Sequence, residues 1–274
     1  MTKILACITA RMQSTRLPGK VLKPIAGKPM NRYIYERLMR DSDSVHNVCY
    51  CIPMGEGNDV LRKTVSEWGA VYQSSANEDV LKNFIDAGDQ NNADILLRIT
   101  GDNIFTSPEY IDAMVDKHLQ TNADYSRVQG LPLGMTAEAM NLSMLKDLHN
   151  HIDDPAQTQY LLMYAFDPDR YKCTVLEPQK KHNKPFISVT VDTQEDWDRT
   201  ERILNTYSSE EWGPKTNKIF EWFEAHQQDV KRLEPETEIK MPHGKTVTYQ
   251  GFLGEMQSRT EKSNYIREDE YDLG

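Results

Sequence analysis

The sequence has no acidic residue in its first 35 positions. Aspartate and glutamate begin at Glu36, although the 274-residue chain holds 42 of them against 32 lysines and arginines, a net charge of −10. Seven cations give the acid-free stretch a charge of +7, which leaves −17 for the rest. Nucleic acids bind proteins mainly through phosphate neutralisation, which an acidic protein does poorly. The asymmetry therefore argues against a nucleic-acid partner and favours a small anion bound near these cations.

Long apolar runs and cysteines are also scarce. No run approaches the roughly 18 apolar residues that cross a bilayer, and residues 1–9 are too short for a secretory signal, so we expect no membrane partner. Of the four cysteines, Cys49 and Cys51 share one face of a strand-like run, and no second Cys/His pair completes a zinc set. We expect reduced, structural thiols in a cytoplasmic protein.

Two widespread phosphate-binding motifs are missing, Gly-x-x-x-x-Gly-Lys-Ser/Thr and Gly-x-Gly-x-x-Gly. The first strand-like run is followed instead by the loop Ala10-Arg-Met-Gln-Ser-Thr-Arg-Leu-Pro-Gly-Lys20. Its arginines offer bidentate contacts to phosphate, and its lysine offers a point charge that can follow a moving phosphoryl group. Taken alone, the loop is either a polyphosphate site or a solvated basic surface.

Strand-like runs alternate with helical patterns over the first 205 residues, most clearly before Asn122. Predicted strands at residues 4–9, 45–52, 71–73 and 95–100 are followed by helical spacing over residues 29–40 and after Asn58, Asn77 and Ser107. This order predicts an α/β fold, an open, mixed, mostly parallel Rossmann-like sheet with helices on both faces. Ligands in such sheets lie at the carboxyl ends of the strands.

The pattern is looser beyond Asn122. We predict short strands at 124–127 and 138–140, helices near 143–151 and 155–166, and a last clear strand at 186–191. Thr193 and Asp196 then form a capping box that begins a helix, and residues 217–228 form a further helix. We predict a nucleotidyltransferase domain over residues 1–207 and a C-terminal helical extension and tail over residues 208–274.

Two carboxylates follow predicted strands. Asp102 ends Arg98-Ile-Thr-Gly-Asp102, and Asp192 follows the predicted strand at 186–191. Singly, Asp102 is also compatible with a Gly-Asp turn and Asp192 with a helix cap. Together with the basic loop they predict a triphosphate site with Mg²⁺, or alternatively Mn²⁺, held between the two carboxylates.

The loop and its continuation, Ala10-Arg-Met-Gln-Ser-Thr-Arg-Leu-Pro-Gly-Lys-Val-Leu-Lys-Pro-Ile-Ala-Gly-Lys-Pro-Met30, resemble the opening signature of the sugar cytidylyltransferases. The chain is most similar to the spore-coat polysaccharide biosynthesis protein F group, which is related to the 3-deoxy-manno-octulosonate and acylneuraminate cytidylyltransferases. Glu78-Asp-Val-Leu81, Arg98-Ile-Thr-Gly-Asp102 and Val191-Asp-Thr-Gln-Glu-Asp196 stand in the family's order and spacing. The resemblance covers about residues 4–204.

The resemblance implies a nucleotide-diphospho-sugar transferase type of fold and Mg²⁺-dependent transfer of CMP from CTP, with pyrophosphate leaving. Arg11, Arg16 and Lys20 would stabilise charge during transfer, and Asp102 and Asp192 would hold the metal. The implied nucleotide contacts are Ala10, Arg11, Ser14, Arg16, Lys20, Ser75, Asp79, Arg98 and Asp102. The family is usually dimeric, so a homodimer is expected.

Departures from the family pattern leave the substrates open. Ser75-Ala-Asn77 stands where the family has Gly-Ser-Glu, so a nucleotidyltransferase using GTP or UTP on a sugar phosphate is one alternative. Gly134 and Glu138 match the family's acceptor motif, whereas Gln159 and Tyr160 begin the segment that replaces Glu-His-Val-Thr.

These four residues are the expected acceptor contacts. The acceptor is expected to be a small acidic or sugar-like molecule, namely a sugar, sugar acid or related phosphate or phosphonate, in surface-polysaccharide or natural-product biosynthesis. A catalytically silent nucleotide-binding or assembly protein is the alternative from another class.

Overall fold

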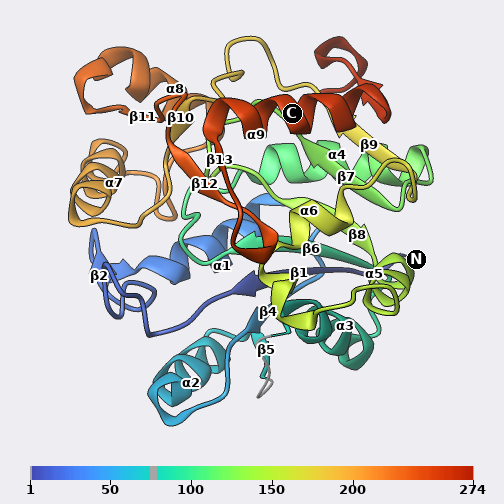
Figure 1. Ribbon diagram of the computed structural model, residues 1–274. Helices are drawn as coiled ribbons and strands as arrows, with labels where there is room; N and C mark the ends of the chain where they lie inside the picture. The colour runs from blue at the N-terminus through green and yellow to red at the C-terminus, as the bar shows by residue number, and fades with distance from the viewer. Residues whose placement is uncertain (1, 75–78, 274) are drawn as a thin grey trace.

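The structure, a computed structural model, describes residues 2–74 and 79–273 around one central sheet (Figure 1). Its eight strands have the order β14-β9-β7-β8-β6-β1-β4-β5, and every neighbouring pair is parallel except the two that include β8. The predicted mixed, mostly parallel sheet is confirmed. The strands are β1 (Ile4–Thr9), β4 (Asn47–Cys51), β5 (Val71–Gln73), β6 (Ile95–Thr100), β7 (Tyr125–Val128), β8 (Glu138–Asn141), β9 (Cys173–Leu176) and β14 (Asn264–Ile266).

Helices cover both faces of the sheet because the buried strands are apolar on both sides. In β1, Ile4, Ala6 and Ile8 belong to one hydrophobic cluster, and Leu5 and Cys7 to the other. The first cluster includes side chains of α1 (Met30–Asp41), α2 (Asp59–Glu67), α4 (Pro108–Gln120), α7 (Gln194–Thr206) and α8 (Thr216–Ala225). The second includes side chains of α3 (Val80–Asn91), α5 (Leu142–His149), α6 (Leu161–Ala165) and α9 (Tyr249–Glu261).

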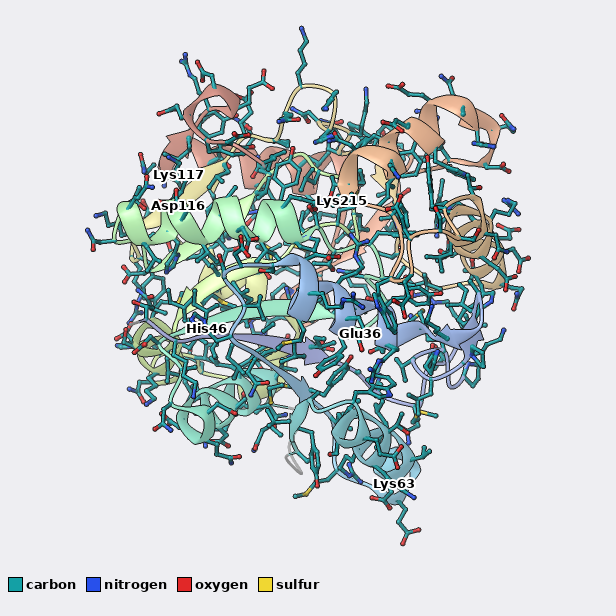
Figure 2. The ribbon with its side chains drawn as sticks, turned by 180° about the vertical axis from the view of Figure 1, so that it is seen from behind. Glu36, His46, Lys63, Asp116, Lys117 and Lys215 are labelled. Carbon is teal, nitrogen blue, oxygen red and sulfur yellow. The ribbon has the colours of Figure 1, made fainter. Side chains whose placement is uncertain are left out.

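The two views separate these faces. Figure 1 looks onto the side that carries α6 and α9. Figure 2 looks from behind, where Glu36 marks α1 and Asp116 and Lys117 mark α4. Within the described residues, no helix is long and apolar enough to cross a membrane. All four cysteines are free and buried, which agrees with structural thiols.

One predicted strand is wrong in extent and in place. Of residues 186–191, only β10 (Ile187–Ser188) is a strand, and it pairs with β11 (Lys231–Arg232) outside the central sheet. The backbone there bonds to loops: Leu133 N–H donates to the Ile187 carbonyl, and Val189 N–H donates to the Leu133 carbonyl. Two further small hairpins are β2 (Pro24–Ile25) with β3 (Lys28–Pro29), and β12 (Glu238–Lys240) with β13 (Thr246–Thr248).

The helix starts confirm two predicted caps and change two others. Ser107 accepts from Tyr110 N–H at α4, and Thr193 forms the capping box with Asp196 at α7. Asn58 precedes α2 without capping it, because its side chain bonds to Met12 and Pro53 instead. The cap of α3 is Asp79, whereas Asn77 lies outside the described residues.

The segment after residue 207 packs onto the same architecture. Trp222 of α8 is buried in the first cluster, and Met256 of α9 is buried in the second. Strand β14 extends the central sheet by pairing in parallel with β9. The predicted helical extension and tail thus supplies an edge strand and a covering helix.

Candidate active site

The exits of β1 and β6 lie against each other at the carboxyl edge of the sheet. Gly101 N–H donates to the Thr9 carbonyl at 2.8 Å. A Cβ on Gly101 would come 2.9 Å from that oxygen and 3.0 Å from Asn31 Oδ1, so only glycine fits this close approach. The buried Asn31 donates to the Gly101 carbonyl at 2.6 Å. These contacts fix the backbone from which Asp102 projects.

The basic loop is held by its own backbone and by a neighbouring loop. Asn58 Oδ1 accepts from Met12 N–H at 2.9 Å, and the Met12 carbonyl accepts from Gly19 N–H. Ser14 Oγ accepts from Leu17 N–H at 3.3 Å, so this predicted nucleotide contact also shapes the loop. Ala10 is buried and donates its N–H to the Cys51 carbonyl. The loop is therefore a tethered turn at the end of β1.

The predicted cations of the loop differ in exposure. Arg11 and Arg16 are exposed, and Arg16 lies 3.1 Å from Asp192 Oδ1. Lys20 is buried and points to the two predicted metal ligands. Its ammonium lies 3.0 Å from Asp192 Oδ1 and 3.3 Å from Asp102 Oδ2, and it donates to the Val191 carbonyl at 2.6 Å. The structure thus gathers Arg16, Lys20, Asp102 and Asp192 into one cluster.

Asp192 reaches this cluster through backbone pairing. Val191 N–H donates to the Asp102 carbonyl at 3.1 Å, which places the next residue beside the β6 exit. Behind it, Asp196 accepts from the backbone N–H groups of Asp192 and Thr193. The first turn of α7 therefore holds the Asp192 backbone in place.

Asp196 is itself buried and ion-paired to two cations. Its carboxylate binds Arg199 at 2.9 Å and Lys231 at 3.0 Å. Burial alone would raise the pKa of Asp196, but the bonds from Lys231 and Arg199 outweigh it and lower the pKa to about 2. This carboxylate is a structural anchor behind the candidate site.

Asp102 and Asp192 have the donor chemistry that Mg²⁺ requires. Both offer carboxylate oxygens, and one ammonium already touches both, so a single cation can be shared between them. Over residues 2–74 and 79–273, no group of three or more His, Cys, Asp or Glu side chains could hold a metal ion. Mg²⁺ suits this limited set, because it is commonly bound by one or two carboxylates together with waters and substrate phosphates.

A cavity of about 330 Å³ adjoins the cluster, and Asp102 belongs to both. Its wall combines the ends of β6 and β7, the loop before β8, and α9. Arg98, predicted to contact the nucleotide, lies in this cavity, where it is ion-paired to Glu138. The predicted acceptor residue Glu138 lines the same wall.

The other predicted contacts lie elsewhere. Gly134 adopts a positive φ of 100° and packs against the backbone of Thr190, which lines the cavity. Gln159 and Tyr160 do not line this cavity, although Leu162 does. Asp79 accepts from Lys82 N–H, Thr158 Oγ1 and His149 Nε2, so its carboxylate is engaged in joining α3 to its neighbours. Ser75 lies outside the described residues.

Sequence reasoning missed Arg127 and the α9 side chains of this wall. Arg127 shares a strand face with Tyr125 and lies opposite Glu138 in the β7–β8 register. An arginine that follows the apolar Ala123 and Tyr125 at strand spacing could have marked this position as a candidate site residue. Tyr249, Phe252 and Leu253 also line the cavity, but no local pattern connects a C-terminal helix with it.

Comparison with known proteins places most of the chain in one family. A family model described as cytidylyltransferase matches residues 5–223. The spore coat polysaccharide biosynthesis protein SpsF of Bacillus subtilis is 30% identical over 206 residues, 72% of this chain and 85% of that protein. A 3-deoxy-manno-octulosonate cytidylyltransferase of Pelobacter propionicus is 34% identical over 116 residues, 41% of this chain and 43% of that protein.

Solved structures share the fold. A cytidylyltransferase from Leptospira borgpetersenii matches with a TM-score of 0.77 at 22% identity, covering 85% of this chain and 99% of the other. A CMP:2-keto-3-deoxy-manno-octonic acid synthetase complexed with CTP matches with a TM-score of 0.59 at 16% identity, covering 75% and 100%. At these identities the likeness shows a common fold.

Proposed function

Because this chain belongs to the cytidylyltransferase family, and is a CTP-dependent nucleotidyltransferase, we propose that it transfers CMP from CTP to a small acidic or sugar-like acceptor. An acceptor oxygen attacks the α-phosphorus, the bond between the α-phosphorus and the bridging oxygen breaks, and pyrophosphate leaves with the electron pair. The names of the relatives favour a sugar or sugar acid as acceptor, and a related phosphate or phosphonate stays the alternative expected from the sequence. The name of the Bacillus subtilis relative also favours surface-polysaccharide biosynthesis as the setting, with natural-product biosynthesis as the alternative expected from the sequence.

The observation that carries this proposal is the cluster of Lys20, Arg16, Asp102 and Asp192 at the strand exits. Arg11, Arg16 and Lys20 would bind the triphosphate and balance the charge that develops on the leaving pyrophosphate. Catalysis of this kind depends on positioning and charge neutralisation, so it requires no nucleophilic side chain.

Asp102 and Asp192 would hold Mg²⁺, or alternatively Mn²⁺. The bound ion would supply positive charge to the phosphate oxygens. Asp102 also lines the adjoining cavity, together with the predicted acceptor residue Glu138. A homodimer and a cytoplasmic location stay predictions from the sequence.

The experiment measures pyrophosphate release with Mg²⁺, each nucleoside triphosphate in turn, and a panel of sugar acids, sugar phosphates and phosphonates. We expect CTP to raise the melting temperature and to turn over with at least one acceptor. Preference for GTP or UTP would favour the alternative donor. Nucleotide binding without turnover on any acceptor would favour the silent assembly protein, and no effect of CTP at all would overturn the proposal.

A further inference from the structure

The cavity beside the cluster contains an arginine whose guanidinium makes no hydrogen bond or ion pair to an oxygen of the described residues, although it lies over the Phe166 ring, 5.3 Å from the centroid. Arg127 donates through Nη1 to Met256 Sδ at 3.2 Å, a weak acceptor, and its buried Nε has no partner in the described part of the chain. A guanidinium carries five N–H donors. One Nη1–H is used by Met256 and the Nε–H is buried, so the three other η N–H donors are available to a ligand in the cavity.

The neighbouring carboxylate is already occupied. Arg98, Glu138 and Arg127 form one row across β6, β8 and β7, since each arginine pairs with Glu138 in the strand register. Glu138 Oε2 accepts from Arg98, and Glu138 Oε1 accepts from Tyr125 Oη at 2.6 Å. The row carries two positive charges and one negative charge, so it is complementary to a single anionic group.

Burial and charge have opposite effects on Glu138. Desolvation alone would raise its pKa, but Arg98 and Arg127, with hydrogen bonds from Tyr125 and Arg98, outweigh desolvation and lower it. The carboxylate therefore stays ionised and balances one arginine. The second arginine is left as the excess charge of the row.

Helix α9 closes the cavity over this row. Tyr249, Phe252, Leu253 and Met256 line it, on a helix that begins 26 residues after the family match ends at residue 223. The helix is fixed at both ends: Tyr249 Oη donates to the Pro185 carbonyl at 2.6 Å, and Arg259 donates to the Met163 carbonyl at 2.9 Å. An ordered apolar wall thus faces the cationic row.

We propose that α9 is the acceptor-specificity element of this protein. In this arrangement, Arg127 binds an anionic group of the acceptor, a carboxylate, phosphate or phosphonate, while Phe252 and Leu253 limit its size. The cavity of about 330 Å³ is at the small end of the range for small-molecule sites, which fits a compact acid. This inference rests on the proposed function, because it identifies the cavity with the acceptor site.

Direct binding tests the inference without turnover. Calorimetry measures binding of inorganic phosphate, phosphonoacetate, 3-deoxy-manno-octulosonate and N-acetylneuraminate, with glucose as the neutral compound. We expect at least one acid to bind and glucose not to bind. Arg127→Gln should weaken the acid on the order of tenfold or more, the usual effect of losing a hydrogen bond to a charged group. Arg127→Lys should retain part of the affinity.

Two matched α9 variants separate the cavity wall from general damage to the helix. Leu253→Trp fills the cavity and should abolish acid binding, whereas Ser258→Trp on the exposed side should bind like the wild type. Thermal unfolding confirms that each variant folds. Equal binding by the Leu253→Trp and Ser258→Trp proteins, equal binding of glucose, or no acid binding would each overturn the inference.

Thiol labelling provides a second readout, because all four native cysteines are buried. Burial raises the pKa of Cys173 to about 12 and also raises that of Cys7, so these thiols react slowly. The bound acid should protect Leu253→Cys from labelling and leave Ser258→Cys unprotected. CTP binding is measured separately by thermal shift, so loss of CTP binding would count against the proposed function, and unprotected Leu253→Cys would count against the α9 inference.

Discussion

The ammonium group of Lys20 lies 3.0 Å from the carboxylate of Asp192, although 172 residues separate them in the sequence. The same ammonium lies 3.3 Å from Asp102. A lysine predicted for the triphosphate thus forms ion pairs with both carboxylates predicted for the metal. Binding of a metal–nucleotide complex must therefore rearrange these contacts or share them.

Replacing Asp102 with asparagine tests the metal assignment. Asp102→Asn removes a charge without changing shape, so turnover should fall on the order of a hundredfold or more. Stability should change little, because the carboxylate is partly exposed. Asp116→Asn on α4, labelled in Figure 2, is the control, since its exposed side chain lies away from the site. The measurement is pyrophosphate release with urea unfolding, and full activity of Asp102→Asn would refute the assignment.

Replacing Lys20 with methionine should lower stability and increase the response to metal. The change leaves two neighbouring carboxylates without their shared ammonium. Because these carboxylates are about a quarter exposed and can be solvated, we expect a loss of about 1–3 kcal/mol. Mg²⁺ should then raise the melting temperature of Lys20→Met more than that of the wild type, because it replaces the missing charge. Lys63→Met, an exposed lysine of α2 labelled in Figure 2, should show neither effect. An identical Mg²⁺ response in all three proteins would contradict this expectation.

Asp196 should make folding stability depend on acid pH. Its folded pKa, about 2, lies below the unfolded value near 3.8. A lowered pKa stabilises the fold above the unfolded pKa, and the contribution, about 2 kcal/mol, is lost as pH falls from about 4 to about 2. The wild type should therefore exceed Asp196→Asn in unfolding free energy at pH 6, by a gap that shrinks at pH 3. Urea titrations at the two pH values measure this difference in unfolding free energy. A difference that is the same at pH 6 and pH 3 would contradict the lowered pKa of Asp196.

Adding one methyl group at Gly101 should disturb the strand exit. The Cβ of Gly101→Ala would meet the Thr9 carbonyl at 2.9 Å, so we expect a loss of about 1–3 kcal/mol and weaker CTP binding. Gly254→Ala is the matched control, because its new Cβ would have no atom within 4 Å apart from its chain neighbours and the local helix backbone. In that exposed helical position alanine should stabilise by about 0.5–1 kcal/mol. Similar urea midpoints for the two variants would contradict the close packing at Gly101.

The sequence was most informative where local pattern and burial agree. Ile95–Thr100 and Val71–Gln73 are the predicted strands to the residue, because short strand-like runs between helical segments leave few alternatives. The expected proximity of Asp102 and Asp192 is also observed. Its cause differs from the expected one, since Asp192 does not follow a strand of the central sheet but is held by the Val191–Asp102 backbone bond.

Long-range contacts account for what the sequence could not predict. Lys20 was expected at the triphosphate, and its place between two carboxylates depends on partners 82 and 172 residues away. Strand β14 has three residues, of which only Ile266 is buried, so its pairing with β9 leaves little local trace. Helix α9 lines the same cavity as residues more than a hundred positions earlier in the chain, and a local sequence pattern carries no information about such a contact.

The row of Arg98, Glu138 and Arg127 is fixed by backbone pairing. Neighbouring strands lie about 4.8 Å apart, so two steps across β8 set the two arginine backbones roughly 10 Å from each other. Substitutions within the cavity cannot alter this backbone distance without breaking the hydrogen bonds that pair β6, β8 and β7. Related proteins that evolve from this one should therefore keep the spacing of the three charges, which the sheet sets. A change of acceptor should come from substitutions in the loops and in α9.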